Sequence, residues 1–189
     1  HQGKIILIAA GIAGFLTALI PEALLFWLIE SIFSSDLFSS IVSLLIPGIF
    51  EETARLIWFK YFLSKHMDSK KTPISYGIGH GGIECILTGI GVLIKKNEFN
   101  IIWGTFIFGI LDRISGMILQ VSFSVFVFKS VKENNLILFF VAIALQDISN
   151  LFSIFYCFEL VKNQIISEII LFLIAIGVAI VAYKLYQSI

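Results

Sequence analysis

The sequence GIFEETARLIWFKYFL, residues 48–63, carries Glu51, Glu52 and Arg55 within a stretch that is otherwise apolar. Both glutamates lie three or four positions from Arg55, so all three side chains share one face of a helix. An ionised group that faces lipid costs at least about 2.5 to 3.5 kcal/mol. A membrane helix that keeps these charges is therefore expected to turn that face toward other polar groups or toward water.

The composition of the whole chain is that of an integral membrane protein. Of its 189 residues, 58% are hydrophobic and only 14% are charged, with a mean hydropathy of +0.99. The formal net charge is zero, so no basic surface favours nucleic acid, and we expect no nucleic-acid partner. The two cysteines, Cys85 and Cys157, lie in apolar segments, where a buried thiol is expected rather than a disulfide.

Six apolar segments are long enough to cross a membrane, since about 20 residues span the hydrocarbon core. Pro21 and Pro47 lie inside the first two and are expected to kink them, because proline lacks a backbone donor. The joints are short and polar, which leaves no room for a soluble domain. The sequence thus predicts an all-α polytopic transmembrane bundle, a single membrane domain over 1–189, with helices at about 4–32, 37–64, 73–94, 99–129, 134–160 and 164–187.

The basic residues predict the orientation of these helices. With Arg55 and Arg113 set aside because they lie at depth, eight lysines fall on one side and three on the other. By the positive-inside rule, we expect a cell-membrane protein with both ends of this sequence in the cytoplasm. The eight are Lys4, Lys60, Lys65, Lys70, Lys71, Lys129, Lys132 and Lys184, and the three are Lys95, Lys96 and Lys162.

Polar residues from four helices are predicted to lie at one depth. Counted from the expected cytoplasmic helix ends, Glu52, Glu84 and Gln146 each lie about 17 Å into the bilayer, at 1.5 Å per residue. Glu22 could join this polar layer from the outer side. The remaining members lie within about one turn of that level or slightly beyond it: Arg55, His80, Asp112, Arg113, Gln120 and Asn150.

The polar layer has two interpretations. Its members could hold the helices together, with the two arginines neutralising carboxylates, or they could form a reactive site. We favour the site, because so many ionisable groups at one depth exceed what the association of six helices requires. The expected catalytic residues are Glu51, Glu52 and His80, and the expected supporting residues are Arg55, Glu84, Asp112, Arg113, Gln120, Gln146 and Asn150.

These residue types allow hydrolysis by an activated water. One carboxylate near His80 can take a proton from water while an imidazole or amide donor stabilises the developing oxyanion, so that no cofactor is required. The alternative is a divalent metal such as zinc, held by His80, Glu84 and either Glu52 or Glu51. The chain has only three histidines, few for a rich zinc site.

The segment YGIGHGGIE, residues 76–84, is rich in glycine. It lacks the preceding strand and the Gly-Lys-Ser/Thr end of a phosphate-binding loop. In a membrane helix, glycines allow a second backbone to approach closely. We expect Gly77, Gly79, Gly81 and Gly82 to do so and to bring His80 and Glu84 near the carboxylates of the preceding helix.

GIFEETAR followed by YGIGHGGIE resembles the two signature segments of the YhfC family of bacterial multi-pass membrane proteins. This family is placed with the CAAX-protease and bacteriocin-processing superfamily of glutamic-type intramembrane proteases. LDRISGMILQ, residues 111–120, and ALQDISN, residues 144–150, are similar to its later motifs. The resemblance implies that Glu51 or Glu52 activates water, that Arg55 fixes the pair, and that His80 and Glu84 line the pocket.

The chain also departs from that pattern. Asp112 stands where the family is expected to have Glu, and Gln146 stands where the superfamily has His, with Asn150 retained four residues later. Glutamine can donate a hydrogen bond but cannot carry a proton. The resemblance further implies at least one helix upstream of His1.

The same superfamily includes the polytopic scaffold subunit of gamma-secretase, to which EETARLIWFKYFL and TPISYGIG are similar. The leading hypothesis is an intramembrane endopeptidase acting on a peptide or protein in or near the bilayer. A second is a non-catalytic scaffold or immunity-type protein that binds a membrane-protein partner. A third is a small-solute transport subunit, although no repeated pair of interrupted helices supports it.

Overall fold

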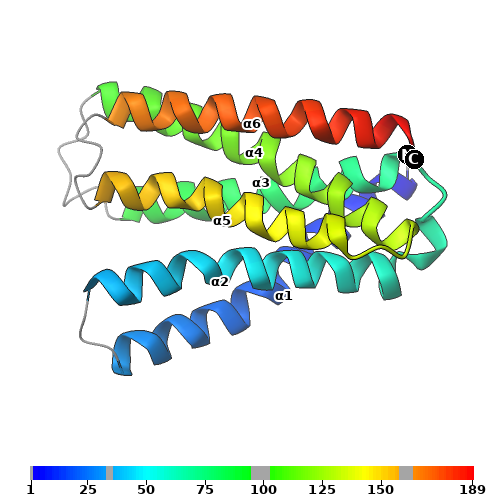
Figure 1. Cartoon of the computed structure of the whole chain (residues 1–189), viewed down its shortest axis with the longest axis horizontal. Coiled ribbons are helices and arrows are strands. Elements are labelled where there is room, and N and C mark those ends of the chain that lie inside the picture. Colours follow the sequence, from blue (N-terminus) through cyan, green and yellow to red (C-terminus); the bar gives the residue numbers. More distant parts are fainter. Residues whose placement is uncertain (1, 33–35, 95–102, 158–163) are drawn as a thin grey trace.

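The computed structural model describes residues 2–32, 36–94, 103–157 and 164–189 of the chain. It is an all-α bundle without a strand in these ranges, which confirms the predicted fold class (Figure 1). The long helices are α1 Gln2–Ile32, α2 Asp36–Ile57, α3 Lys71–Ile94, α4 Trp103–Lys132, α5 Ile137–Cys157 and α6 Gln164–Gln187. α1 and α2 continue as helices on both sides of Pro21 and Pro47.

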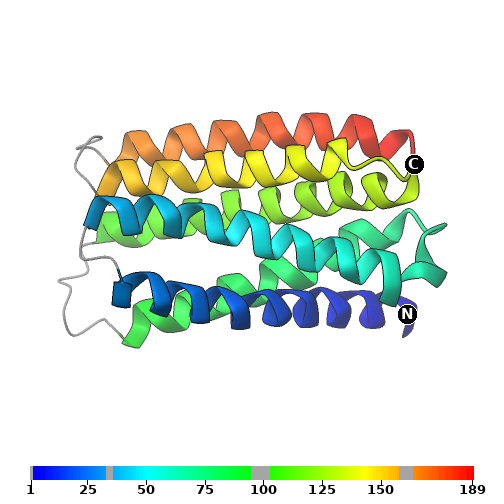
Figure 2. The ribbon, with the colours of Figure 1, turned by 60° about the horizontal axis from the view of Figure 1, so that its bottom comes forward.

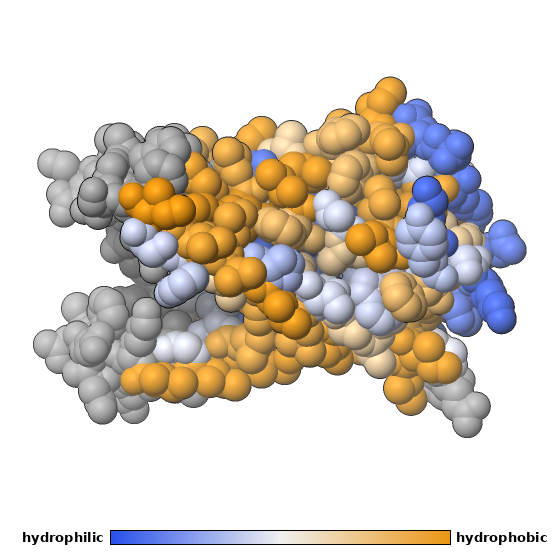
Figure 3. All heavy atoms as spheres, turned by 90° about the horizontal axis from the view of Figure 1, so that it is seen from below, coloured by the Kyte–Doolittle hydropathy of each residue, from blue (hydrophilic) through white to orange (hydrophobic). Residues whose placement is uncertain are grey.

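The surface of the bundle suits a membrane. Among the described residues, three helices are long and apolar enough to cross one, over Gly3–Ile29, Gly109–Lys132 and Ile165–Gln187, and Ile137–Leu151 is a shorter apolar helix. Figure 3 shows apolar side chains along the body of the molecule and hydrophilic ones gathered at the end where both termini lie.

The helix neighbours place α4 at the centre of the bundle. α4 packs against α2, α3, α5 and α6, while α1 packs against α2 and α3 on the other side (Figure 2). Much of α4 is accordingly buried, including Phe123 and the run from Val125 to Phe128. Polar side chains on α2, α3 and α4 can therefore meet inside the bundle.

The end of α2 differs from the single helix predicted over 37–64. The backbone becomes a π-helix at Trp58–Phe62, followed by a 3₁₀ turn at Ser64–His66. This wider turn buries Phe59 completely, with its ring centroid 4.7 Å from that of Tyr76 and 5.4 Å from that of Phe128. Packing of this aromatic ring in the core is our explanation for the change of helix type.

Glycines bring α3 very close to α1. A Cβ atom at Gly79 would lie 2.0 Å from the backbone oxygen of Ile8, and one at Gly11 would lie 2.0 Å from the backbone oxygen of Tyr76. Real Cβ atoms do not approach other atoms so closely. Only glycine therefore permits this contact between the two backbones.

The other glycines of residues 76–84 differ in their surroundings. A Cβ at Gly77 would lie 2.6 Å from Val121 Cα, and one at Gly81 would lie 3.0 Å from Gln120 Cβ, both in α4. The prediction of close approach is wrong for Gly82, which has no such neighbour within 4 Å. The glycines pack α3 on α1 and α4, the two helices that flank it.

Candidate functional site

His80 of α3 and Glu51 of α2 form the centre of the site. Their Nε2 and Oε2 atoms are 3.0 Å apart, and their side chains are 0% and 8% exposed. Phe15 of α1 packs edge-on against the imidazole, with 5.2 Å between ring centroids. The predicted approach of His80 to the carboxylates of the preceding helix is therefore present.

Glu52 and Arg55 form an ion pair one turn apart on α2. Arg55 Nη1 donates to Glu52 Oε1, and both side chains are completely buried. Removing one partner of such a pair leaves an uncompensated buried charge, so the two residues are coupled. Glu52 Oε2 and Arg55 Nε make no hydrogen bond within the described part of the protein.

Gln120 of α4 connects these groups across three helices. Its Oε1 accepts a hydrogen bond from Arg55 Nη2 at 2.5 Å, and its Nε2 donates to Glu51 Oε2 at 3.0 Å and to Glu84 Oε2 at 2.8 Å. The amide uses its acceptor and both of its donors, so its orientation is fixed. Gln120 thus links the cation of α2 to one carboxylate on α2 and one on α3.

α1 and α5 add further buried polar groups. Glu22 of α1 is 5% exposed and lies within electrostatic range of Glu51 and Glu84. Gln146 of α5 is 4% exposed, and its Oε1 has no partner within the described residues. His80 Nδ1 is likewise unpartnered there. Buried polar atoms are normally paired, so water or substrate is expected to bind them.

Four of the predicted supporting residues make no described hydrogen bond to this network: Gln146, Asp112, Arg113 and Asn150. Arg113 Nε donates to its neighbour Asp112 Oδ2 at 2.9 Å, and the two side chains are 34% and 27% exposed. They form a local pair on α4, about two turns from Gln120. Asn150 is partly buried on α5, and no described hydrogen bond joins its side chain to the network. Arg113 is nevertheless close enough to Glu84 to interact with it electrostatically.

Two residues near the site were missed in the sequence. Tyr76 is completely buried, its hydroxyl has no hydrogen-bond partner among the described residues, and its ring centroid is 6.1 Å from that of His80. Its position four residues before His80 is a signal that could have found it. Asp147 lies against α2, since a Cβ at Gly48 would be 2.0 Å from its Oδ1. Its position three residues before Asn150 is a similar signal.

The sequence of this chain is similar to those of a known membrane-protein family. The family described as "YhfC intramembrane metalloprotease" matches residues 28–104 and 91–171, a range that contains α2 to α5 and every residue of the network except Glu22. The chain belongs to the YhfC family. No solved structure matches it.

A curated YhfC relative is known from Bacillus subtilis (strain 168). It is described as "Uncharacterized membrane protein YhfC" and is 27% identical to this chain over 169 residues. The match covers 74% of this chain and 65% of the relative. The chain therefore spans less than two thirds of that relative's length.

The metal named in the family description can be tested against the donors of this YhfC-family chain. A catalytic zinc usually has three protein ligands, and the described residues contain no group of three or more His, Cys, Asp or Glu that could hold an ion. The predicted ligands already make hydrogen bonds in this arrangement: His80 and Glu51 to each other, Glu52 to Arg55, and Glu84 to Gln120. The donors as arranged do not fit a metal, and we derive no step through one.

Proposed function

We propose that this chain is an intramembrane endopeptidase that hydrolyses a peptide bond at or within the membrane, with a water activated by Glu51. The observation that carries the proposal is the buried contact of 3.0 Å between Glu51 and His80, reinforced by Gln120 on the same carboxylate oxygen. Two donors fix the direction of that carboxylate before substrate arrives. Such preorganisation favours proton transfer in a site from which bulk water is excluded.

Glu51 suits the role of base better than Glu52. Both described hydrogen bonds to Glu51 end on Oε2, which leaves Oε1 for a water, and its side chain retains 8% exposure. Glu52 is completely enclosed and paired with Arg55. We assign Glu52 the role of holding Arg55, which in turn holds Gln120 against Glu51.

The reaction then needs one proton carrier and one oxyanion donor. Glu51 takes a proton from water as the water oxygen attacks the carbonyl carbon, and it returns that proton to the amine when the C–N bond breaks. His80 Nε2 donates to Glu51, so Nδ1 of a neutral imidazole is an acceptor and cannot stabilise an oxyanion. We assign that role to the amide of Gln146, which is buried on α5 beside α2.

The test is a cleavage assay in detergent micelles with fluorogenic and transmembrane peptides. Glu51→Gln is expected to lower kcat about 100-fold or more, because the base is removed while the shape is kept. Asp112→Asn is the matched control, since it neutralises another carboxyl group at depth outside the network. Thermal unfolding of each variant verifies that it is folded.

Two outcomes contradict the proposal. Glu51→Gln that keeps more than half of the wild-type rate would remove Glu51 as the base. Activity that is lost with a chelator and restored by zinc would replace glutamate activation by the metal chemistry that the family description names. Activity that survives the chelator supports water activation by Glu51.

A second candidate function is a non-catalytic scaffold or immunity-type binding protein. Gln146 favours it, because a residue that cannot carry a proton stands where the wider protease superfamily has His. The resemblance of residues 51–63 to the scaffold subunit of gamma-secretase, proposed from the sequence alone, motivates the same idea. This function predicts a membrane-protein partner that co-purifies equally with the wild-type chain and with Glu51→Gln, and no cleavage by either.

A further inference from the structure

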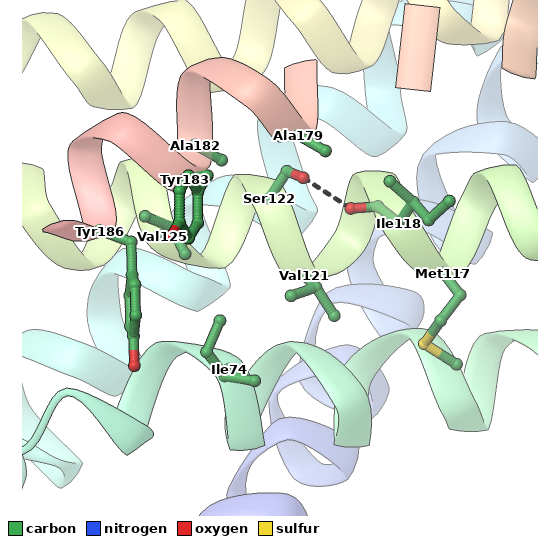
Figure 4. A pocket seen from close by; sticks show the side chains of 10 residues that line it. All are labelled: Ile74, Met117, Ile118, Val121, Ser122, Val125, Ala179, Ala182, Tyr183 and Tyr186. Carbon is green, nitrogen blue, oxygen red and sulfur yellow. Dashed lines mark hydrogen bonds between the residues drawn. The ribbon is translucent and has the colours of Figure 1, made fainter. Parts of the chain in front are cut away.

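A groove lies on the outside of the bundle, away from the polar site. It runs along α4 with α3 on one side and α6 on the other (Figure 4). Its volume is about 400 Å³ and its lining is almost entirely apolar. The hydroxyl of Ser122, which lines it, donates to the backbone oxygen of Ile118 at 2.7 Å and is thereby satisfied. The groove thus suits a hydrocarbon ligand.

The depth of the groove matches one leaflet of a bilayer. Its lining on α4 extends from Met117 to Val125, which is about 12 Å at 1.5 Å per residue. Ile74 lines it on α3, one turn from the start of that helix at Lys71. The groove therefore runs inward from the helix ends, through the region where acyl chains lie.

Polar and cationic groups gather at the outer end of the groove. Tyr183 and Tyr186 of α6 line that end (Figure 4), and tyrosine is favoured where hydrocarbon meets headgroups. Lys70 reaches from the start of α3 to the carbonyl oxygen of Gln187 at 3.5 Å, which leaves its other ammonium donors available. Lys71 is also exposed beside it, and Asp68 is the single carboxylate in residues 64–71.

The dimensions favour a chain over a helix. A helix with its side chains is about 10 Å in diameter. An acyl chain is thinner and needs no hydrogen bonds. The lysines at the outer end complement a negative charge. Together these features favour a lipid with an anionic headgroup.

We propose that this groove binds an anionic phospholipid, with one acyl chain between α3 and α6 and the phosphate at Lys70 and Lys71. The site does not depend on the proposed peptidase activity, since none of its residues belongs to the hydrogen-bonded network. Bound lipid would join the start of α3 to the end of α6.

Native mass spectrometry of the chain in mild detergent tests this site. The probes are phosphatidylglycerol and phosphatidylcholine with identical acyl chains, added at equal concentration. Wild type is expected to retain at least threefold more phosphatidylglycerol. Ala179→Phe should reduce retention of both lipids at least threefold, because the added ring fills the groove. Ile180→Phe, on the adjacent exposed residue, is the matched control and should bind as wild type does.

A double variant, Lys70→Gln with Lys71→Gln, tests the headgroup contact without altering the core. It should bind the two lipids equally. The proposal is overturned if wild type shows no preference, if Ala179→Phe and Ile180→Phe retain the same amount of lipid, or if glycerol phosphate alone is retained as well as the lipid. A photo-crosslinker at position 179 that captures a protein and no lipid would overturn it too.

Discussion

Gln120 is the residue at which the polar groups of three helices meet. Its amide lies between the guanidinium of Arg55 and the carboxylates of Glu51 and Glu84, and it makes a hydrogen bond to each. A neutral amide in this position separates two acids from one another while it orients both. The network therefore depends on an uncharged side chain that hydrogen-bonds to three charged ones.

Gln120→Leu is expected to destabilise the protein by about 3 kcal/mol or more, because Arg55, Glu51 and Glu84 each lose one hydrogen bond inside the bundle. Gln146→Leu makes the same chemical change at a buried glutamine whose Oε1 has no partner, and should cost less. Unfolding followed by circular dichroism in mixed micelles measures both. Equal losses of stability in the two variants would mean that the hydrogen bonds of Gln120 do not stabilise the folded protein.

Helical spacing predicted most residues of this network. What spacing could not predict depends on how the helices pack against one another. Glu51, Arg55, His80 and Glu84 lie on polar faces that can be counted along each helix. Spacing cannot say which face meets which across the bundle, so Arg113 was grouped with the layer although it pairs with its own neighbour. It also could not distinguish Glu51 from Glu52, which differ only in the partners that the fold supplies.

At the scale of helices, the contact between α1 and α3 depends on glycine. The backbones approach so closely at Gly79 and Gly11 that a single added methyl group would collide with a carbonyl oxygen. This contact supports the helix that presents His80, and it places Phe15 of α1 against the imidazole. The packing of α1 is thus a structural condition for the geometry of the site.

Gly79→Ala should destabilise the protein by about 1 to 3 kcal/mol or more, because backbone atoms must move to accommodate the methyl group. Gly82→Ala, three residues later on the same helix, should be neutral or stabilise by up to about 1 kcal/mol, since it meets open space and alanine favours helix. Thermal unfolding compares the two variants. A stable Gly79→Ala variant would contradict the close contact.

The elements were predictable to different degrees. Long apolar runs between polar joints predicted six helices, because the membrane fixes the length of a span. The π-helix at Trp58–Phe62 was not predictable, since it depends on where Phe59 packs among residues distant in sequence. The glycine-rich segment indicated close packing, but only the fold decides that α1 and α4 are the partners.

Within the described part of the chain, charged residues lie in two distinct places. Hydrophilic residues gather at the end that holds both termini, which includes the start of α3 and the ends of α4 and α6 (Figure 3). The paired charges of the site are enclosed within the bundle. Lysines at the membrane surface interact with anionic headgroups, whereas a charge in hydrocarbon requires a partner. One chain can therefore hold an ionised site at depth and still present an apolar surface to lipid.

The lysine distribution predicts that the end with both termini faces the cytoplasm. Fusions of green fluorescent protein and alkaline phosphatase after residues 68 and 189, and after residues 34 and 162, test this orientation. Fluorescence is expected at the first two positions and phosphatase activity at the other two, because lysine-rich short loops are retained on the cytoplasmic side. The reverse pattern would mean that the buried charges of α2 override the lysines, and it would place the outer end of the lipid groove in the opposite leaflet.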